Sequence, residues 1–388
     1  MKQVTRHKST DYTYTLICDG NNLLKISLVD KTMNSNGEEY GAVMSFLRML
    51  GNVLNKKDFN YCIVCFDGIG SGVLRWKFYE DYKANRGKNY ELHDPNMSDY
   101  DKKLIAFQQK VLSYSRKVNP KKEDDDEVFE REKGIINAIL EELCIRQYEF
   151  ENVEGDDIIA YYVKNKKPNE KVVIVSSDKD LTQLISDTVI VYNPRLKDFI
   201  TKDNSVEKIG ITHENVVLEK ILCGDSSDNI KGVKGMGETT LLKLFPQIKN
   251  EKTDLKTIIA RSKELLEERK ANKKKPLKSL ENIVNGITDG CQGDKLYEIN
   301  EKIIDLSQPL LTDEAKESLE NELYAVMDTS NRSIKNVYEI IRAYNLTELE
   351  DENKFSNLFA PFERIIMMEN RRYGKYKESN REKKKQSQ

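Results

Sequence analysis

The chain has 388 residues, of which 38% are hydrophobic and 33% charged, and its formal net charge is −2. It contains no apolar stretch near the roughly 20 residues that a membrane span requires, and its N-terminus lacks the apolar core of a signal peptide. These features exclude a transmembrane protein and favour a soluble, cytoplasmic protein with one large or two medium domains.

The first half of the chain alternates apolar runs with helical segments, which is typical of an α/β fold with a mostly parallel sheet. Strands are predicted at 13–19 and 61–67, with a helix at 38–55 between them. The charged segment 75–150 follows and is far longer than a normal crossover. We expect it to leave the sheet as an excursion that is helical at both ends.

Aspartates follow three of the predicted strands at the point where each apolar run stops. Asp19 ends TYTLICD, Asp67 ends YCIVCFD and Asp178 ends KVVIVSSD. The carboxyl ends of parallel strands meet at one edge of a sheet, where active sites form. The sequence therefore predicts that these three carboxylates lie close together.

The acids of this region fall into five short clusters. So many converging carboxylates would repel one another unless divalent cations neutralised them, and ligand sets made only of oxygen suit Mg²⁺ or Mn²⁺. Helix capping alone could explain Asp156 or Asp157 but not all five clusters. We therefore predict metal-dependent phosphate chemistry for the nine residues Asp19, Asp67, Glu154, Asp156, Asp157, Asp178, Asp180, Asp225 and Asp228.

Cysteine and histidine offer no competing site. The six cysteines lie mostly inside apolar runs and are predicted to be buried thiols. Cys62 and Cys65 form a C-x-x-C, but the pair sits within a predicted strand with no second pair or histidine nearby, which argues against zinc or redox chemistry. Three scattered histidines are too few for a histidine-centred mechanism.

The segment 224–245 has the pattern of a helix-hairpin-helix. A predicted helix at 213–223 precedes GVKGMG, and the amphipathic run ETTLLKLF follows it. Closely spaced glycines let backbone N–H groups approach a phosphate. An ordinary tight turn is the alternative, and the neighbouring Lys231, Lys234 and Lys243 favour the phosphate-binding interpretation.

Basic residues gather in three further places. Lys77, Lys83, Arg86 and Lys88 follow the second predicted strand, and the other two groups lie at 268–278 and 371–388, the latter with eight Lys or Arg and two Glu. Each is interpreted either as a solvated, partly disordered face or as a set of phosphate contacts. The apolar run 354–368 favours a core helix over a partner-docking peptide.

Four strings together resemble the flap endonuclease and 5′–3′ exonuclease family, which includes the nuclease domain of bacterial DNA polymerase I and stand-alone phage enzymes. They are CFDGIGSGVLRWKFYEDYKANR, VEGDDIIAYYVK, SSDKDLTQLISD and CGDSSDNIKGVKGMGETT. The resemblance runs from Asp19 to about Phe245 and is looser beyond. Gly155 stands where the family usually has alanine.

The resemblance implies the PIN-like 5′ nuclease fold and two divalent ions, Mg²⁺ or Mn²⁺, about 4 Å apart. Asp157 and Asp228 would lie near the ligands. The first ion would be held by Asp19, Asp67, Glu154 and Asp156, and the second by Asp178, Asp180 and Asp225.

The resemblance also assigns the basic residues. Segment 75–130 would be the helical arch with Arg75, Lys83 and Arg86 on DNA, and Lys83 and Arg86 would act in catalysis at the scissile phosphate. Segment 213–247 would hold duplex and a K⁺ ion. Its DNA-binding residues would be Lys231, Gly232, Lys234, Gly235, Gly237, Thr239 and Lys243.

From this follows the prediction of a structure-specific 5′ nuclease that removes RNA primers or flaps during replication. Its partners would be DNA with a 5′ flap or overhang, RNA/DNA primer hybrids and a sliding clamp or single-strand-binding protein. We expect a monomer, in the host cytoplasm if it is phage-encoded. The expected domains are the nuclease at 10–350, a C-terminal helix at 351–370 and a disordered basic tail at 371–388.

Two alternatives remain at this point. A PIN-type ribonuclease acting on single-stranded RNA shares the acidic sheet edge but usually lacks both the long arch and the glycine hairpin. A non-catalytic junction-binding protein would keep the fold and lack some of the acids, and none is missing here.

Overall fold

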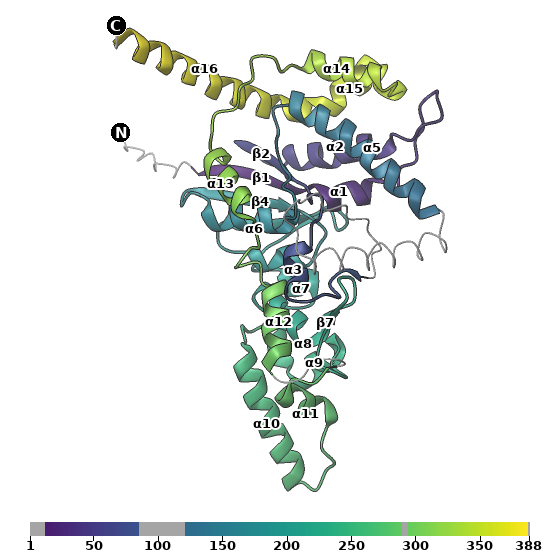
Figure 1. The fold of residues 1–388 in the computed structure, drawn as a ribbon, viewed down its shortest axis with the longest axis vertical. Coiled ribbons are helices and arrows are strands. Elements are labelled where there is room, and N and C mark those ends of the chain that lie inside the picture. The colour runs from purple at the N-terminus through teal and green to yellow at the C-terminus, as the bar shows by residue number, and fades with distance from the viewer. Residues whose placement is uncertain (1–11, 85–120, 289–293, 387–388) are drawn as a thin grey trace, which may run out of the picture.

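The computed structural model describes residues 12–84, 121–288 and 294–386. Within them, six strands form one sheet in the order β3-β2-β1-β4-β5-β6, with every neighbouring pair parallel except β5 and β6 (Figure 1). The mostly parallel α/β sheet is thus confirmed. The strands are β1 (Thr13–Asp19), β2 (Tyr61–Cys65), β3 (Arg146–Tyr148), β4 (Glu170–Val175), β5 (Val189–Asn193) and β6 (Asp198–Ile200).

The strand order reverses around β1. The chain passes from β1 to β2 and β3 on one side and then returns to β4 on the other side. Asp19 is level with Cys65 of β2, and Cys18 is level with Val175 of β4. Such a reversal opens a crevice at the carboxyl edge of the sheet, where ligands bind in doubly wound folds.

Both faces of the sheet are covered because successive strand residues point to opposite sides. Leu16 and Cys18 pack into one apolar cluster and Ile17 into the other. Cys62 and Cys65 likewise face opposite clusters, so this C-x-x-C cannot close around one ion. The first face carries α1 (Gly20–Ser27), α2 (Gly41–Leu54) and α5 (Lys121–Glu142), and the second carries α6 (Gly155–Asn165), η2 (Asp180–Leu184) and α13 (Asp313–Glu322).

A second, mainly helical region lies beyond the carboxyl edge of the sheet and has its own core around Leu241 and Phe245. Figure 1 shows it in the lower half of the molecule. Its elements are α3 (Val73–Trp76), α7 (Ser205–Ile209), η3 (His213–Asn215), α8 (Val216–Cys223), β7 (Gly224–Asp225), β8 (Ile230–Lys231), α9 (Glu238–Leu244), η4 (Pro246–Lys249), α10 (Leu255–Ala271), α11 (Lys278–Asn285) and α12 (Asp294–Ile304).

The C-terminal elements belong to the first face of the sheet. Phe359, Phe362 and Ile365 are buried in the same apolar cluster as α2, so the expected boundary at residue 351 does not separate a unit. The core-helix interpretation of 354–368 therefore holds. The elements are α14 (Ile334–Ala343), η5 (Thr347–Glu350), α15 (Glu352–Phe359), η6 (Ala360–Phe362) and α16 (Glu363–Gln386).

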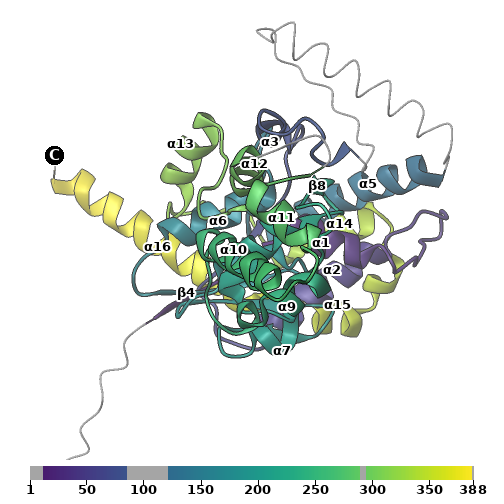
Figure 2. The ribbon, with the colours of Figure 1, turned by 90° about the horizontal axis from the view of Figure 1, so that it is seen from below.

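The expectation of a disordered tail from residue 371 is wrong, because α16 runs through it to Gln386 and extends away from the body (Figure 2). The helix is anchored where it leaves the core. Arg372 donates to the backbone oxygen of Asn60 at 2.7 Å, and its guanidinium lies 3.8 Å from the centre of the Tyr61 ring. In the described parts of the chain, no helix is long and apolar enough to cross a membrane.

Candidate active site

Asp19 stands at the centre of the carboxyl edge of the sheet. It ends β1 and caps α1, where its side chain accepts from the Asn22 backbone N–H at 3.0 Å. The Ser176 hydroxyl donates to it at 2.9 Å. Burial, together with the negative charges of Asp67 and Asp178, raises the pKa of Asp19 to about 7. The site thus holds more negative charge than its own hydrogen bonds neutralise.

Asp67 joins the end of β2 to the start of α6. It accepts from the Asn21 side-chain amide at 2.7 Å and from the Gly155 backbone N–H at 2.9 Å. The second bond brings the first turn of α6, with Glu154 as N-cap and Asp156 within it, against the sheet edge. A helix N-terminus favours such acids through its partial positive charge.

Asp156 has a strongly raised pKa, which reflects its electrostatic contact with the other acids of this first group. The causes are burial and then, in decreasing order, the charges of Asp19, Asp178, Asp67 and Glu154. The structure therefore brings together five carboxylates that the sequence places on four separate segments. Oxygen-only donors crowded in this way suit a hard divalent ion.

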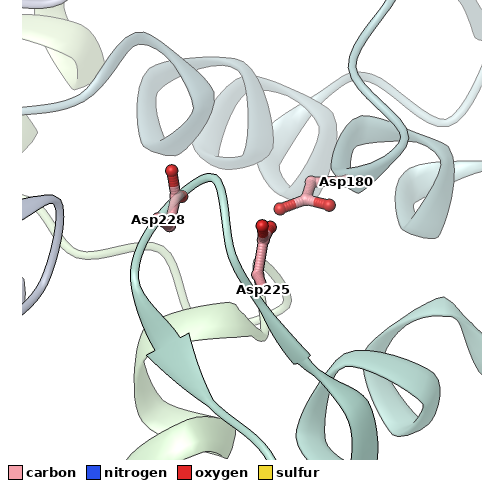
Figure 3. A group of neighbouring side chains, drawn as sticks. All are labelled: Asp180, Asp225 and Asp228. Atoms are coloured by element: carbon pink, nitrogen blue, oxygen red, sulfur yellow. The ribbon is translucent and has the colours of Figure 1, made fainter. Parts of the chain in front are cut away.

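A second group consists of Asp180, Asp225 and Asp228, which offer carboxylate oxygens within 4.8 Å of one another (Figure 3). Asp180 begins η2, whereas Asp225 and Asp228 belong to the β7–β8 hairpin. Burial and the charge of Asp178 raise the pKa of Asp180 to about 7, so the two groups are electrostatically linked. Their donor chemistry fits a second divalent ion.

Lys220 is a member of this site that the sequence analysis missed. Its ammonium on α8 pairs with both Asp180 and Asp225, at 2.5 Å from the latter. Although burial opposes ionisation, Lys220 and hydrogen bonds from Ser227 lower the pKa of Asp225 to about 2. The only signal in the sequence was a lysine five residues before Asp225, and nothing in that spacing distinguishes it from a surface lysine.

Lys83 lies among the acids, as its assignment to the catalytic set requires. Its ammonium is 2.7 Å from Glu154, and its backbone N–H donates to the Asp228 carbonyl at 2.8 Å. Burial opposes its charge, but Glu154 and the neighbouring Tyr82 and Asp228 raise the pKa of Lys83 well above its usual value. Lys83 therefore stays protonated as a fixed cation at the site.

Arg75 and Asp157 correct two predictions. Arg75 is 4% exposed and pairs with Asp157 at 2.5 Å and with Glu154 at 3.1 Å. Asp157, which is 1% exposed, also accepts from the Leu310 N–H at 2.9 Å. In this structure the Arg75 guanidinium therefore pairs inside the protein instead of facing DNA, and Asp157 is engaged in that ion pair. A buried guanidinium requires such a partner.

Trp76 and Tyr82 of segment 75–130 are both buried. The Trp76 ring N–H donates to the Tyr82 carbonyl at 2.7 Å. Arg86 and most of the predicted arch, residues 85–120, lie outside the described residues.

The glycine hairpin forms as predicted between α8 and α9, but its glycines serve different purposes. A Cβ on Gly232 would lie 2.2 Å from the Cys223 carbonyl carbon, so this glycine serves backbone packing and not phosphate approach. Gly235 has φ +78°, which favours glycine. Gly237 has an extended φ of −125°, and a Cβ there would meet open space.

The basic residues near this turn are accessible. Lys231 precedes it, Lys234 lies within it, and Lys243 lies on α9, all three with exposed side chains. The Thr239 side chain on α9 is exposed as well. The Lys234 backbone is held by hydrogen bonds to Ile287 and from Asn282, each of 2.8 Å. The turn therefore presents an open, positively charged surface.

The chain is similar to known proteins over much of its length. Residues 14–216, just over half of the chain, match the family described as 5′-3′ exonuclease, N-terminal resolvase-like domain. The chain is 30% identical over 256 residues to DNA polymerase I of Bacillus subtilis (strain 168). The aligned segment covers 64% of this chain and 25% of that protein.

A 5′-3′ exonuclease of Aquifex aeolicus (strain VF5) is 30% identical over 220 residues, covering 56% of this chain and 63% of that protein. The chain thus spans less than two thirds of both relatives. Among solved structures, the T5 D15 protein co-crystallised with metal ions has a TM-score of 0.48 and 18% identity, with 87% of this chain and 98% of that chain covered.

Proposed function

Because the chain belongs to the 5′-3′ exonuclease family, we propose that it is a structure-specific 5′ nuclease that hydrolyses phosphodiester bonds near 5′ ends. The observation that carries this proposal is the meeting of two acid groups with the protonated Lys83 at one sheet edge, beside the glycine hairpin. Its role would be to remove primers and flaps during replication. It would act in the cytoplasm, which is the host's cytoplasm if the protein is phage-encoded.

The acids suit two divalent ions, and we propose Mg²⁺ or Mn²⁺ as the ions used. When bound, such ions supply an activated water and neutralise charge on the leaving oxygen. Asp19, Asp67, Asp156 and Asp178 would hold the first, with Glu154 at its side. Asp180, Asp225 and Asp228 would hold the second. This division differs from the expected one in two members. The charge of Asp178 raises the pKa of both Asp156 and Asp180, so Asp178 lies near both groups, and Asp228 lies with Asp225.

Lys83 would stabilise the phosphate that is attacked. Its ammonium is held by Glu154 at the edge of the acid group, so a phosphate oxygen could exchange with that carboxylate. Arg86 is proposed for the same phosphate on the strength of the family resemblance alone.

The hairpin would bind duplex through Lys231, Lys234, Gly235, Gly237, Thr239 and Lys243. Backbone N–H groups at an open glycine turn approach phosphates without obstruction. The proposal also includes a K⁺ ion at the hairpin and RNA/DNA primer hybrids as substrates. It further includes a sliding clamp or single-strand-binding protein as partner, and a monomeric state.

Cleavage of a 5′-labelled flap substrate tests this function, with Mg²⁺, Mn²⁺ or EDTA added and single-stranded RNA as the competing substrate. We expect cleavage near the flap base with either metal and none with EDTA. Asp178→Asn should reduce the single-turnover rate by orders of magnitude, because one ligand charge is lost. Asp187→Asn is the matched control, since Asp187 is an exposed partner of Lys202 that precedes the amino end of β5, whereas the acid groups lie at the carboxyl edge of the sheet. Cleavage of the RNA but not of the flap would contradict the proposal.

A further inference from the structure

Helices α10 and α11 pack against each other and lie beyond the glycine hairpin. Figure 1 shows it at the end of the molecule farthest from the sheet. At its base, Ile258 of α10 with Leu280 and Ile283 of α11 joins the core formed by α8 and α9. The connection between the two helices, residues 272–277, forms the tip of the pair.

The tip is strongly basic. No acid occurs between Glu268 and Glu281, an interval that contains Arg269, Lys270, Lys273, Lys274, Lys275 and Lys278. The side chains of Lys273, Lys274 and Lys275 are exposed and form no ion pair with any described residue. Earlier in α10, by contrast, Arg261 pairs with Glu264 and Glu268. Positive charge without a neighbouring acid is thus concentrated at the tip.

The tip is also an ordered turn. The Lys274 N–H donates to the Arg269 carbonyl at 2.8 Å, and the Arg269 Nε–H donates to the Lys275 carbonyl at 2.9 Å. Lys273 adopts φ +52° within this turn. The three lysines therefore project from a fixed backbone, which lowers the entropy lost when they bind.

The tip continues the surface of the glycine hairpin. Asn282 of α11 donates to the Lys234 carbonyl at 2.8 Å. Lys278 lies four residues before Asn282 on the same face of α11, a rise of about 6 Å. Exposed basic side chains thus occur at the glycine hairpin (Lys234), at the start of α11 (Lys278) and at the tip (Lys273–Lys275).

We propose that the α10–α11 tip is a second duplex-binding element, in which Lys273, Lys274 and Lys275 contact the phosphate backbone beyond the part held by the hairpin. The inference rests on the proposed function, since it takes the hairpin as a duplex site. Duplex DNA carries one negative charge per roughly 1.7 Å of axis, so a basic surface that extends away from the hairpin meets a continuous row of phosphates.

The test compares binding to 5′-overhang duplexes with arms of about 10 and about 25 base pairs, measured with Ca²⁺ in place of Mg²⁺. The triple variant Lys273→Ala, Lys274→Ala, Lys275→Ala should lose at least about tenfold in affinity for the long arm and little for the short arm. The slope of log K against log salt should fall in magnitude by about 2 to 3, since each lost contact contributes about 0.9. The corresponding Lys→Arg triple should bind as the wild type does.

A matched control removes three exposed charges from the opposite end of the molecule, with Lys335→Ala, Arg342→Ala and Lys354→Ala in α14 and α15. The inference would be overturned if the tip and control variants lost equal affinity, if the tip variant lost equal affinity for both arms, or if it lost none. A wild type that binds neither duplex would also overturn it. A wild type that binds these duplexes but cleaves no flap would contradict the proposed function alone, because this test reads binding without cleavage.

Discussion

At the scale of single residues, Asp19 shows how the acid site affects stability. Its pKa of about 7 exceeds the value of 3.8 for a free side chain, so the folded state binds a proton more tightly than the unfolded state. That stabilisation is full below about pH 4 and is lost as pH rises through 7. In EDTA, the melting temperature should therefore fall between pH 5.5 and 8, and by less in Asp19→Asn. A variant with the same pH dependence as the wild type would contradict the raised pKa.

Lys220 should regulate how strongly divalent ions stabilise the protein. Its ammonium neutralises Asp180 and Asp225, so removing it leaves a stronger site for a cation. Lys220→Ala should melt at a lower temperature in EDTA and gain more from added Mn²⁺ than the wild type does.

Lys179→Ala is the control for Lys220, because Lys179 pairs at 2.6 Å with Glu219, which belongs to neither acid group. If both variants respond to Mn²⁺ alike, the position of Lys220 between two ligands has no special consequence.

Lys83→Ala should slow cleavage by about 100-fold or more while duplex affinity changes little. The lost ammonium would stabilise charge that develops in the transition state, whereas affinity is spread over many phosphates. Single-turnover rates at saturating enzyme, paired with binding in Ca²⁺, separate the two effects. An unchanged rate would leave Lys83 as a partner of Glu154 only.

At the scale of elements, the hairpin glycines can be separated by substitution. Gly237→Leu should fold normally, since its Cβ meets open space, and should weaken duplex binding by obstructing the backbone. Gly232→Ala should instead destabilise the fold, because its Cβ would clash with Cys223 and Gly224. Melting temperature and duplex affinity together distinguish them, and unchanged affinity in Gly237→Leu would remove the turn from the duplex site.

The elements also show what the sequence could predict. β1, β2 and β4 were predictable because each is an apolar run ending in an aspartate. β3 has three residues, which is too short for a pattern, although it leads the chain to Glu154. The Arg75–Asp157 pair joins residues 82 positions apart, and only the folded backbone decides that this arginine points inward. Residue type indicated the acids of the site, whereas Lys220 and the ion pairs within the site required tertiary structure.

At the scale of the whole molecule, the C-terminal segment is part of the main core. Removing residues 351–388 would expose the cluster that contains Phe359 and Phe362, so this truncation should be insoluble or melt far below the wild type. Ending the chain after Gly374 removes only the projecting part of α16 and should preserve the melting temperature. Equal stability of the two truncations would contradict the packing of α15 and α16.

Residues 79–83, which lead into the predicted arch, are bonded to the β7–β8 hairpin, which leads into the glycine turn. This attachment has a thermodynamic consequence. Lys83 and Tyr79 donate to the backbone oxygens of Asp228 and Asn229, and the Asn229 side chain donates to the Asp81 carbonyl. A ligand that orders one of these two segments thereby lowers the cost of ordering the other. Coupling of this kind is reciprocal: if duplex on the hairpin tightens the capture of a free 5′ strand, that strand must tighten the grip on duplex by the same factor.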